Sequence, residues 1–197
     1  MPRDDEKNSN LPSDEELIER FQNGDVYAFD LIVKRYKNQL LNYIYRFLGN
    51  SEEAEDLVQE TFLRVYRNRN AYQKIAKFST WIYTIAGNLA KTELRKRKRR
   101  KFFSITDLGY DDKDYDILDE AFNPEKSVDS NIKEEIIHNE IQSLSPKFRE
   151  VILLRDVQEL SYEEISQIVD IPLGTVKSRV NRGRLKLQEK LKHLLKS

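Results

Sequence analysis

Apolar residues recur along this chain at three- and four-residue steps, and no segment shows the strict apolar–polar alternation of a half-buried strand. This period predicts helices with one buried face. The clearest case begins at residue 173, where one apolar stripe comprises Leu173, Val176, Val180, Leu187, Leu191 and Leu194. Gly183 falls on the same stripe, and because glycine costs about 1 kcal/mol against alanine inside a helix, we interpret it as a close helix–helix crossing. The pattern predicts an all-α fold.

Capping signals place a second, shorter helix just before this stripe. Ser161-Tyr162-Glu163-Glu164 has the form of a capping box, which predicts a helix from Tyr162 to Val169. Asp170 and Ile171 interrupt it, and Pro172 suits the first turn of the following helix, where its missing N–H has no partner to lose. The region from Leu144 to Leu195 is therefore expected to be a helix-turn-helix followed by a long helix.

Four more helices are expected in the first hundred residues. The first opens at the capping box Ser13-Asp14-Glu15-Glu16 and ends at Asn23-Gly24. The second runs from after Asp25 to Gly49, and the third from Ser51 to about Arg67. A polar loop, residues 68–78, precedes the fourth, which begins at Ser79 or Thr80 and continues into a basic block.

Charge divides the chain into parts although the formal net charge is zero. Residues 91–101 hold eight bases and one acid, whereas residues 102–143 hold twelve acids and three bases. We therefore expect a flexible N-terminus (1–12), a helical domain (13–101), an acidic flexible linker (102–129) and a helix-turn-helix domain (130–197). The two domains are expected to fold separately and to be loosely tethered. The linker itself fits either a solvated spacer or an electrostatic mimic of nucleic acid.

Composition excludes several classes of protein. With no cysteine, the chain has no disulfide framework and no thiolate nucleophile. No apolar run approaches the length of a membrane span, and the first residues lack the apolar core of a signal peptide, so we expect a cytoplasmic protein without membrane insertion. The two histidines, His138 and His193, stand in no catalytic or metal-binding spacing. We predict no enzyme, no catalytic residue, no metal site and no cofactor.

The face of the last helix away from its apolar stripe is basic. It carries Lys177, Ser178, Arg179, Asn181, Arg182, Arg184 and Lys186. A charged face opposite an apolar stripe is usually just solvated, but such faces mix both signs. From residue 177 to the end there are eight bases and one acid. This bias favours a helix that binds phosphates and base edges in a major groove.

Two features of the first domain exceed what a helical core requires. Asp56, Gln59 and Glu60 share one face of the third helix. This face is either an ordinary solvated surface or a binding surface. Aromatic residues also alternate with bases around the fourth helix: Tyr72, Phe78, Trp81 and Tyr83 with Lys74, Lys77, Lys91 and Arg95. This combination suits stacking of unpaired bases. The alternative, that these aromatics are core residues, remains open.

Three motifs in this order resemble bacterial sigma factors of the extracytoplasmic-function group. They are Asp56-Leu57-Val58-Gln59-Glu60-Thr61-Phe62, Phe78-Ser79-Thr80-Trp81-Ile82-Tyr83-Thr84-Ile85-Ala86-Gly87-Asn88 and Leu173-Gly174-Thr175-Val176-Lys177-Ser178-Arg179. The resemblance spans nearly the whole chain from Glu15 to Leu195. It implies a sigma-2-type bundle that binds core RNA polymerase and melts the −10 element, and a sigma-4-type domain that reads the −35 element. Gly87 departs from the pattern, because relatives often carry a larger or basic residue there.

The resemblance also implies roles for single residues. The polymerase-binding set is Asp56, Gln59 and Glu60. The −10 set is Tyr72, Lys77, Phe78, Ser79, Thr80, Trp81, Tyr83, Asn88, Lys91 and Arg95. The −35 set is Thr175, Lys177, Ser178, Arg179, Asn181, Arg182, Arg184 and Lys186. The implied partners are core RNA polymerase through its clamp and flap regions, promoter DNA and an anti-sigma factor.

Two other classes of protein fit parts of the sequence. A free-standing helix-turn-helix regulator would bind a promoter without polymerase and use its first half to sense a ligand or to dimerise. An adaptor would hold polymerase without touching DNA, but the basic face of the last helix argues against this class. A gel-shift assay with and without core polymerase would settle most of this choice.

Overall fold

The computed structural model describes residues 11–108 and 128–192, and every regular element among them is helical. The elements are α1 (Asp14–Gln22), α2 (Val26–Leu48), α3 (Ser51–Arg67), the short 3-10 helix η2 (Arg69–Ala71), α4 (Phe78–Leu108), α5 (Val128–Gln142), α6 (Pro146–Ile152), α7 (Tyr162–Val169) and α8 (Leu173–Lys190). A π-type turn, Leu153–Val157, continues α6. The predicted all-α class is confirmed.

Both predicted capping boxes are present. The Glu16 amide donates to the Ser13 hydroxyl at 3.2 Å, and the Glu16 carboxylate accepts from the Ser13 amide at 2.7 Å. The corresponding distances for Ser161 and Glu164 are 3.1 and 2.8 Å. These paired bonds satisfy amides that a helix start otherwise leaves without partners, which is why short α1 and α7 begin where the sequence predicts.

The boundaries differ from the prediction mainly around the acidic segment. Helix α4 begins at Phe78, slightly earlier than expected, and continues to Leu108, past the predicted end of the first domain. Helix α5 begins at Val128, within the predicted linker, and α6 was not anticipated as a separate element. Residues 109–127, most of the expected linker, lie outside the described residues, as do residues 1–10.

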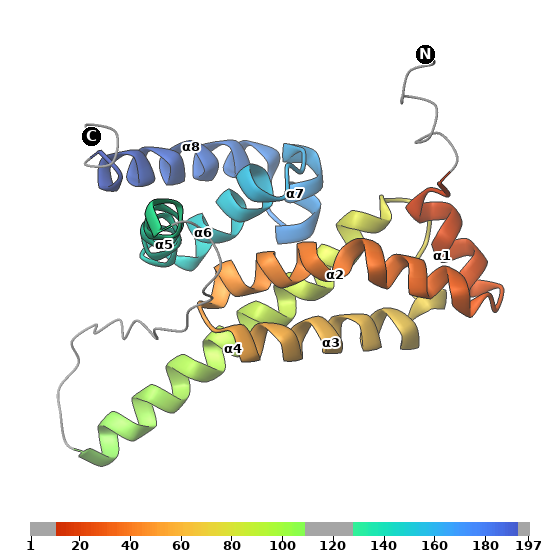
Figure 1. Ribbon diagram of the computed structural model, residues 1–197, viewed down its shortest axis with the longest axis horizontal. Coiled ribbons are helices and arrows are strands. Elements are labelled where there is room, and N and C mark those ends of the chain that lie inside the picture. The colour runs from red at the N-terminus through yellow and green to blue at the C-terminus, as the bar shows by residue number, and fades with distance from the viewer. Residues whose placement is uncertain (1–10, 109–127, 193–197) are drawn as a thin grey trace.

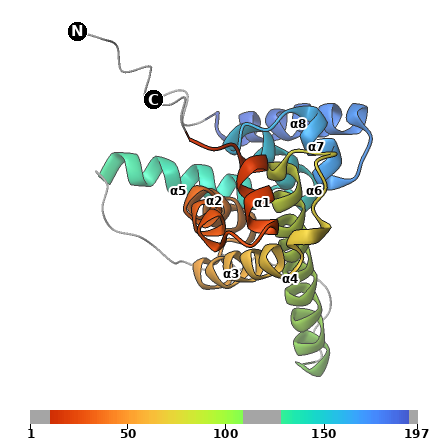
Figure 2. The ribbon, with the colours of Figure 1, turned by 90° about the vertical axis from the view of Figure 1, so that its right-hand side faces the viewer.

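The described helices form two groups (Figure 1). Helices α1–α4 make a bundle in which α2 packs on α1 and α3 and also contacts α4. Helices α5–α8 lie together along one side of that bundle. The C-terminal part of α4 extends away from both groups, as the view along the bundle also shows (Figure 2). This extension carries the basic block.

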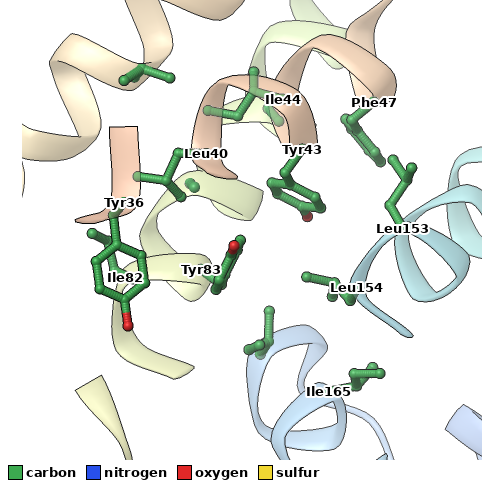
Figure 3. Close-up of a cluster of buried hydrophobic side chains, with 14 of the residues drawn as sticks. Tyr36, Leu40, Tyr43, Ile44, Phe47, Ile82, Tyr83, Leu153, Leu154 and Ile165 are labelled. Carbon is green, nitrogen blue, oxygen red and sulfur yellow. The ribbon is translucent and has the colours of Figure 1, made fainter. Parts of the chain in front are cut away.

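The two groups pack on one another, which corrects the expectation of loosely tethered domains. Leu153, Leu154 and Ile165 from the second group are fully buried in the same core cluster as Tyr43 and Tyr83 from the first. Their side chains face each other across the junction (Figure 3). The apolar contacts across this junction hold the two groups together. The acidic composition of the intervening segment could not predict them, because the flanking helices make these contacts and the segment does not.

Polar side chains of the second group also complete the end of α2. Arg149 donates to the carbonyl of Phe47 at 2.7 Å and to that of Leu144 at 3.1 Å. Gln142 donates to the carbonyl of Arg46 and accepts from Arg149 at 2.8 Å. Because the last carbonyls of a helix have no partner within it, these bonds tie α5 and α6 to the C-terminal end of α2.

Candidate nucleic-acid interface

The helix-turn-helix is built by local hydrogen bonds. Helix α7 ends at Asp170, whose φ of 52° places it in the left-handed region that stops a helix. The Ser166 hydroxyl then donates to the carbonyl of Ile171 at 2.6 Å, which fixes the turn. Pro172 serves as the N-cap of α8, one residue before the position expected for it, and its carbonyl accepts from the amides of Thr175 and Val176.

Gly183 marks a close crossing between α8 and α6, as the sequence predicts. A β-carbon at this position would lie 2.8 Å from Cγ1 of Ile152, closer than packed carbon atoms approach. Val176 and Val180 are buried on the same face of α8. The apolar stripe therefore seats α8 on α6 and leaves its basic face outward.

Most of the predicted −35 residues lie on this outward face. Lys177, Ser178, Asn181, Arg182, Arg184 and Lys186 are exposed, whereas Thr175 and Arg179 are partly buried. Arg184 is already held by an ion pair with Asp156, with its Nε 3.1 Å from the carboxylate. The face thus offers a row of cationic and polar side chains that suits a phosphate backbone and base edges.

The predicted −10 residues are distributed differently. Tyr72, Phe78, Thr80 and Tyr83 are buried, and the three aromatic rings pack edge to face or tilted against neighbouring rings. In this arrangement they are core residues, the alternative that the sequence left open, because Phe78 and Tyr83 pack on aromatic rings of α2 and Tyr72 packs on Phe78. Trp81 and Ser79 are partly buried, while Lys77, Asn88 and Arg95 are exposed.

The second group covers part of this surface. Helix α7 packs along α4, and the Tyr83 hydroxyl donates to the side-chain carbonyl of Gln158. Two lysines of the predicted −10 set also pair with acids of the second group. Lys77 lies 3.1 Å from the carboxylate of Glu164, and Lys91 lies 3.2 Å from that of Glu150.

The Glu150 carboxylate and the Tyr43 hydroxyl face Gly87 at the junction. A β-carbon on Gly87 would lie 3.3 Å from Glu150 Oε1 and 3.2 Å from the Tyr43 hydroxyl oxygen. Burial raises the pKa of Glu150, although the charges of Lys91 and Arg179 oppose this shift. Burial likewise raises the pKa of Tyr43, and its hydroxyl has no hydrogen-bond partner among the described residues. A buried carboxylate and an unpaired hydroxyl both cost free energy.

The predicted polymerase-binding residues share one surface on α3. Asp56 and Gln59 are exposed, and Glu60 is partly exposed and pairs with Arg64 at 2.7 Å. Leu63, which follows Gln59 by one helical turn, is 48% exposed on the same face. The sequence analysis missed Leu63, although its position at i+7 from Asp56 was a readable signal. This face of α3 therefore combines acidic and polar side chains with one exposed apolar side chain.

The basic extension of α4 is anchored at its base. Arg97 donates from Nε to Glu53 at 2.8 Å and from Nη1 to the carbonyl of Leu48 at 2.8 Å. Glu93 pairs with Lys96 at 3.4 Å and with Arg100 at 2.5 Å. Arg95, Lys98 and Arg99 are exposed. The extension presents cations along a helix that projects beyond the bundle (Figure 1).

Residues 11–108 and 128–192 contain no group of three or more histidines or acids placed to hold a metal ion. None of the helices within those residues is both long and apolar enough to cross a bilayer. His138 stacks on Tyr45, with ring centroids 4.7 Å apart, as part of the contact between α5 and α2.

Comparison with known families and proteins gives consistent matches. Residues 32–100 match the family model of Sigma-70 region 2, and residues 134–187 match that of Sigma-70, region 4. The chain is 39% identical over 179 residues to the ECF RNA polymerase sigma factor SigW of Bacillus subtilis, covering 90% of this chain and 96% of that protein. It is 37% identical over 187 residues to the RNA polymerase sigma-H factor of Pseudomonas aeruginosa, covering 93% and 96%.

Solved structures show a similar fold. The sigma factor RpoE of Bartonella quintana, crystallised with the anti-sigma factor NepR, aligns with a TM-score of 0.67 at 27% identity, covering 83% of this chain and 96% of that chain. CnrH, in complex with the cytosolic domain of CnrY, aligns with a TM-score of 0.70 at 19% identity, covering 92% and 99%. The latter likeness concerns the fold alone.

Proposed function

The chain belongs to the extracytoplasmic-function group of the sigma-70 family, and from this premise we propose that it binds core RNA polymerase, directs it to specific promoters and melts the −10 element. In this role it is a transcription regulator and not an enzyme, and it works in the cytoplasm with polymerase. The observation that carries the proposal is the outward basic face of α8, seated on α6 through Gly183.

Helix α8 is the element proposed to read the −35 duplex. Its exposed lysines and arginines neutralise phosphates, and Asn181, Ser178 and the arginines provide donors for base edges. Arg179 is partly buried, and its positive charge opposes the rise in the pKa of Glu150 that burial causes.

Helix α4 and the loop before it are proposed to capture the melted −10 strand. Lys77, Asn88, Lys91 and Arg95 supply cations and donors, and Trp81 is the aromatic of the set that is partly open. Unpairing bases costs a few kcal/mol each, and stacking with phosphate neutralisation returns about 1–3 kcal/mol per base. Tyr72, Phe78 and Tyr83 support this surface from inside the bundle.

The exposed face of α3 is proposed to meet the clamp of core polymerase. Charge reversal at Asp56, written Asp56→Lys, should weaken binding to core at least tenfold without changing helicity. Asp30→Lys is a matched control, because Asp30 is an exposed acid on the neighbouring helix α2. Equal affinity of both variants for core, measured by titration, would refute this assignment.

An anti-sigma factor is the proposed regulator. The related RpoE of Bartonella quintana was crystallised with the anti-sigma factor NepR, and the present chain has surfaces on both groups of helices that such a partner would hide.

A second candidate is a free-standing regulator, favoured by one observation: α8 is open in the free chain while the α4 surface is partly covered. A gel-shift assay with and without core polymerase separates the two functions. We expect weak binding to promoter duplex by the chain alone, and a tight, promoter-specific complex that supports run-off transcription when core is added. Tight specific binding without core, unchanged by core, would favour the free-standing regulator.

A further inference from the structure

One polar stripe of α1 runs beside the loop that joins α3 to α4, residues 68–77, here called the α3–α4 loop. The stripe comprises Glu15, Glu19 and Gln22, which are spaced by four and three residues and so share one face of the helix. The loop runs in the opposite direction, so that the end of the stripe bonds the start of the loop. Helix α1 and this part of the chain lie side by side in both ribbon views (Figures 1 and 2).

Gln22 holds the start of the α3–α4 loop. Its side-chain amide nitrogen donates to the carbonyl of Arg69 at 2.7 Å and to that of Tyr72 at 3.1 Å. Arg69 opens the 3-10 helix η2 and Tyr72 closes it, so one side chain fixes this turn at both ends. The Tyr72 hydroxyl then donates to the carbonyl of Ala76 at 2.9 Å, which closes the second half of the loop. Because both bonds from Gln22 use N–H donors, a carboxylate in its place could not make them.

Glu15 holds the end of the loop, where α4 begins. The Phe78 amide donates to the Glu15 carboxylate at 3.0 Å. The first amides of a helix have no partner within it, and Lys77, the residue before α4, has a side chain without an acceptor. The acceptor at the start of α4 therefore comes from another helix. A carboxylate at this end of α4 also interacts favourably with the helix dipole.

Glu19 completes the stripe but contributes less. It lies 2.9 Å from Lys74, and both side chains are more than half exposed, so the pair adds little stability. Glu15 and Gln22, in contrast, are partly buried and bond backbone atoms. These two residues therefore determine the path of the loop directly.

The α3–α4 loop is fixed through its backbone, while several of its own side chains remain exposed. Ile75 is 87% exposed, and Lys74 and Lys77 are exposed on either side of it. An apolar side chain between two lysines suits contact with an unpaired base whose phosphates are neutralised. A binding site works best when other residues hold its backbone in place and leave its contacting side chains free.

We propose that Glu15 and Gln22 are positioning residues for strand capture: they hold the α3–α4 loop in one conformation before the strand arrives. The inference rests on the proposed function, because it takes this loop and α4 to be the strand-binding surface. Ordering a loop during binding weakens affinity, and a loop that is competent for only a fraction of the time binds more weakly by that fraction. Neither Glu15 nor Gln22 contacts the strand in this account.

Two sets of variants separate the hydrogen bonds from the charges. Glu15→Ala and Glu15→Gln both remove the negative charge, but only glutamine keeps an acceptor for the Phe78 amide. Gln22→Met keeps a side chain of similar length, removes both donors and changes no charge. Gln167→Met is its control, because it makes the same exchange at an exposed position of α7.

Amide hydrogen exchange of the full chain, followed by NMR, reports on the loop itself. Because Glu15 accepts from the Phe78 amide, Glu15→Ala should speed the exchange of that amide about tenfold, whereas Glu15→Gln should stay close to the parent. Gln22→Met should speed the exchange of the amides in and just after η2. Amides in the middle of α2 should keep their parent rates in every variant, which separates loosening of the loop from global unfolding.

Strand opening is measured with core polymerase and a promoter duplex that carries 2-aminopurine in its −10 element. Binding of a −35 duplex and the thermal unfolding temperature are measured on the same proteins. We expect Glu15→Ala and Gln22→Met to reduce opening about tenfold, as for a loop that is competent about a tenth of the time. Their −35 binding should not change. Glu15→Gln should restore most of the opening, and Gln167→Met should match the parent.

Each other outcome has a definite meaning. Unchanged exchange in both Glu15→Ala and Gln22→Met overturns the inference, because these side chains then do not hold the loop. Faster exchange with unchanged opening overturns it as well, because the conformation of the loop then does not matter to the strand. Equal loss in Glu15→Ala and Glu15→Gln would assign the effect of Glu15 to its charge and overturn its positioning role.

A parallel fall in opening, −35 binding and unfolding temperature would also overturn the inference, since the two residues would then stabilise the whole fold. Failure of the proposed function gives a different result. In that case the parent chain with core polymerase opens none of the promoter duplexes that it binds, while hydrogen exchange still shows whether Glu15 and Gln22 hold the loop.

Discussion

Helices α8 and α4 both carry dense positive charge, and the sequence assigns both to DNA, but the structure gives them different environments. The basic face of α8 is open, and its opposite face is fixed on α6 through Val176, Val180 and Gly183. The corresponding surface of α4 is contacted by α7 and partly neutralised by Glu150 and Glu164. The surface proposed for the duplex is exposed, whereas the surface proposed for the single strand is partly covered by α6 and α7.

This difference matches the chemistry of the two proposed tasks. Reading a duplex requires only a rigid helix with exposed donors. Capturing an unpaired strand requires cations and a ring surface that are useful only where a strand has been opened. If α4 captures a strand as proposed, the pairing of Lys77 and Lys91 with Glu164 and Glu150 would limit nonspecific binding to single strands, because nonspecific affinity comes mainly from phosphate neutralisation.

The largest expected effect comes from Arg149, which joins α5 and α6 to the C-terminal end of α2. Arg149→Ala removes bonds to the carbonyls of Phe47 and Leu144 and to the side chain of Gln142. Losing a buried charged donor should lower the free energy of unfolding by about 3–5 kcal/mol. Urea denaturation measures this, with Lys147→Ala on the exposed side of the same helix as the control. If the free energy of unfolding falls by less than about 1 kcal/mol, the Arg149 bonds at the end of α2 do not hold the two groups of helices together.

Gly183→Ala tests the seating of α8. The added methyl group would meet Ile152 at 2.8 Å, and overpacking of this kind costs about 1–3 kcal/mol. We expect lower stability and weaker binding to −35 duplex. Gly174→Ala in the same helix has free space around its β-carbon and should be neutral or stabilising by up to about 1 kcal/mol. Equal stability of the two variants would contradict the close crossing.

Arg182→Ala tests whether the open face of α8 meets phosphates. Arg182 is exposed. Its replacement should reduce the salt slope of duplex binding by about one and weaken binding to every sequence by about 1 kcal/mol. Arg184→Ala should cost less, because the Arg184 guanidinium already pairs with Asp156 and must give up that pair to bind DNA. Duplex titrations at several salt concentrations measure both. Identical slopes for Arg182→Ala and the parent would rule out a phosphate contact.

The smallest effect concerns His138, in the contact between α5 and α2. Burial, with the charges of Arg46 and Arg149, lowers the pKa of His138 to about 4. The unfolded chain therefore binds this proton first, and stability should fall as the pH drops from about 6.5 to about 4, by on the order of 1 kcal/mol after allowing for solvent exposure. Glu150 has the opposite effect on the pH dependence of stability. Burial raises its pKa, so the free-energy cost of burying its charge disappears when the carboxylate is protonated. His138→Phe should remove the loss between pH 7 and pH 5 in thermal unfolding; an unchanged pH dependence would exclude His138 as its source.

Sequence predicted local features better than contacts between distant segments. Capping boxes at Ser13 and Ser161 and the stripe through Gly183 determine helix starts and one crossing, and all are read from residues a few positions apart. The burial of Tyr83 and the pairing of Lys91 with Glu150 depend on segments far apart in the chain. Charge and aromatic content marked α4 as unusual but gave no sign that an acid from α6 would lie on it.

The central proposal, that the −10 element is opened only when core polymerase is present, has one direct measurement. A promoter duplex carrying 2-aminopurine in its −10 element reports strand opening by a rise in fluorescence. The account predicts no rise with the chain alone, even at concentrations where α8 binds the −35 duplex, and a rise when core polymerase is added. A rise with the chain alone, or none when a complete polymerase–promoter complex has formed, would contradict it.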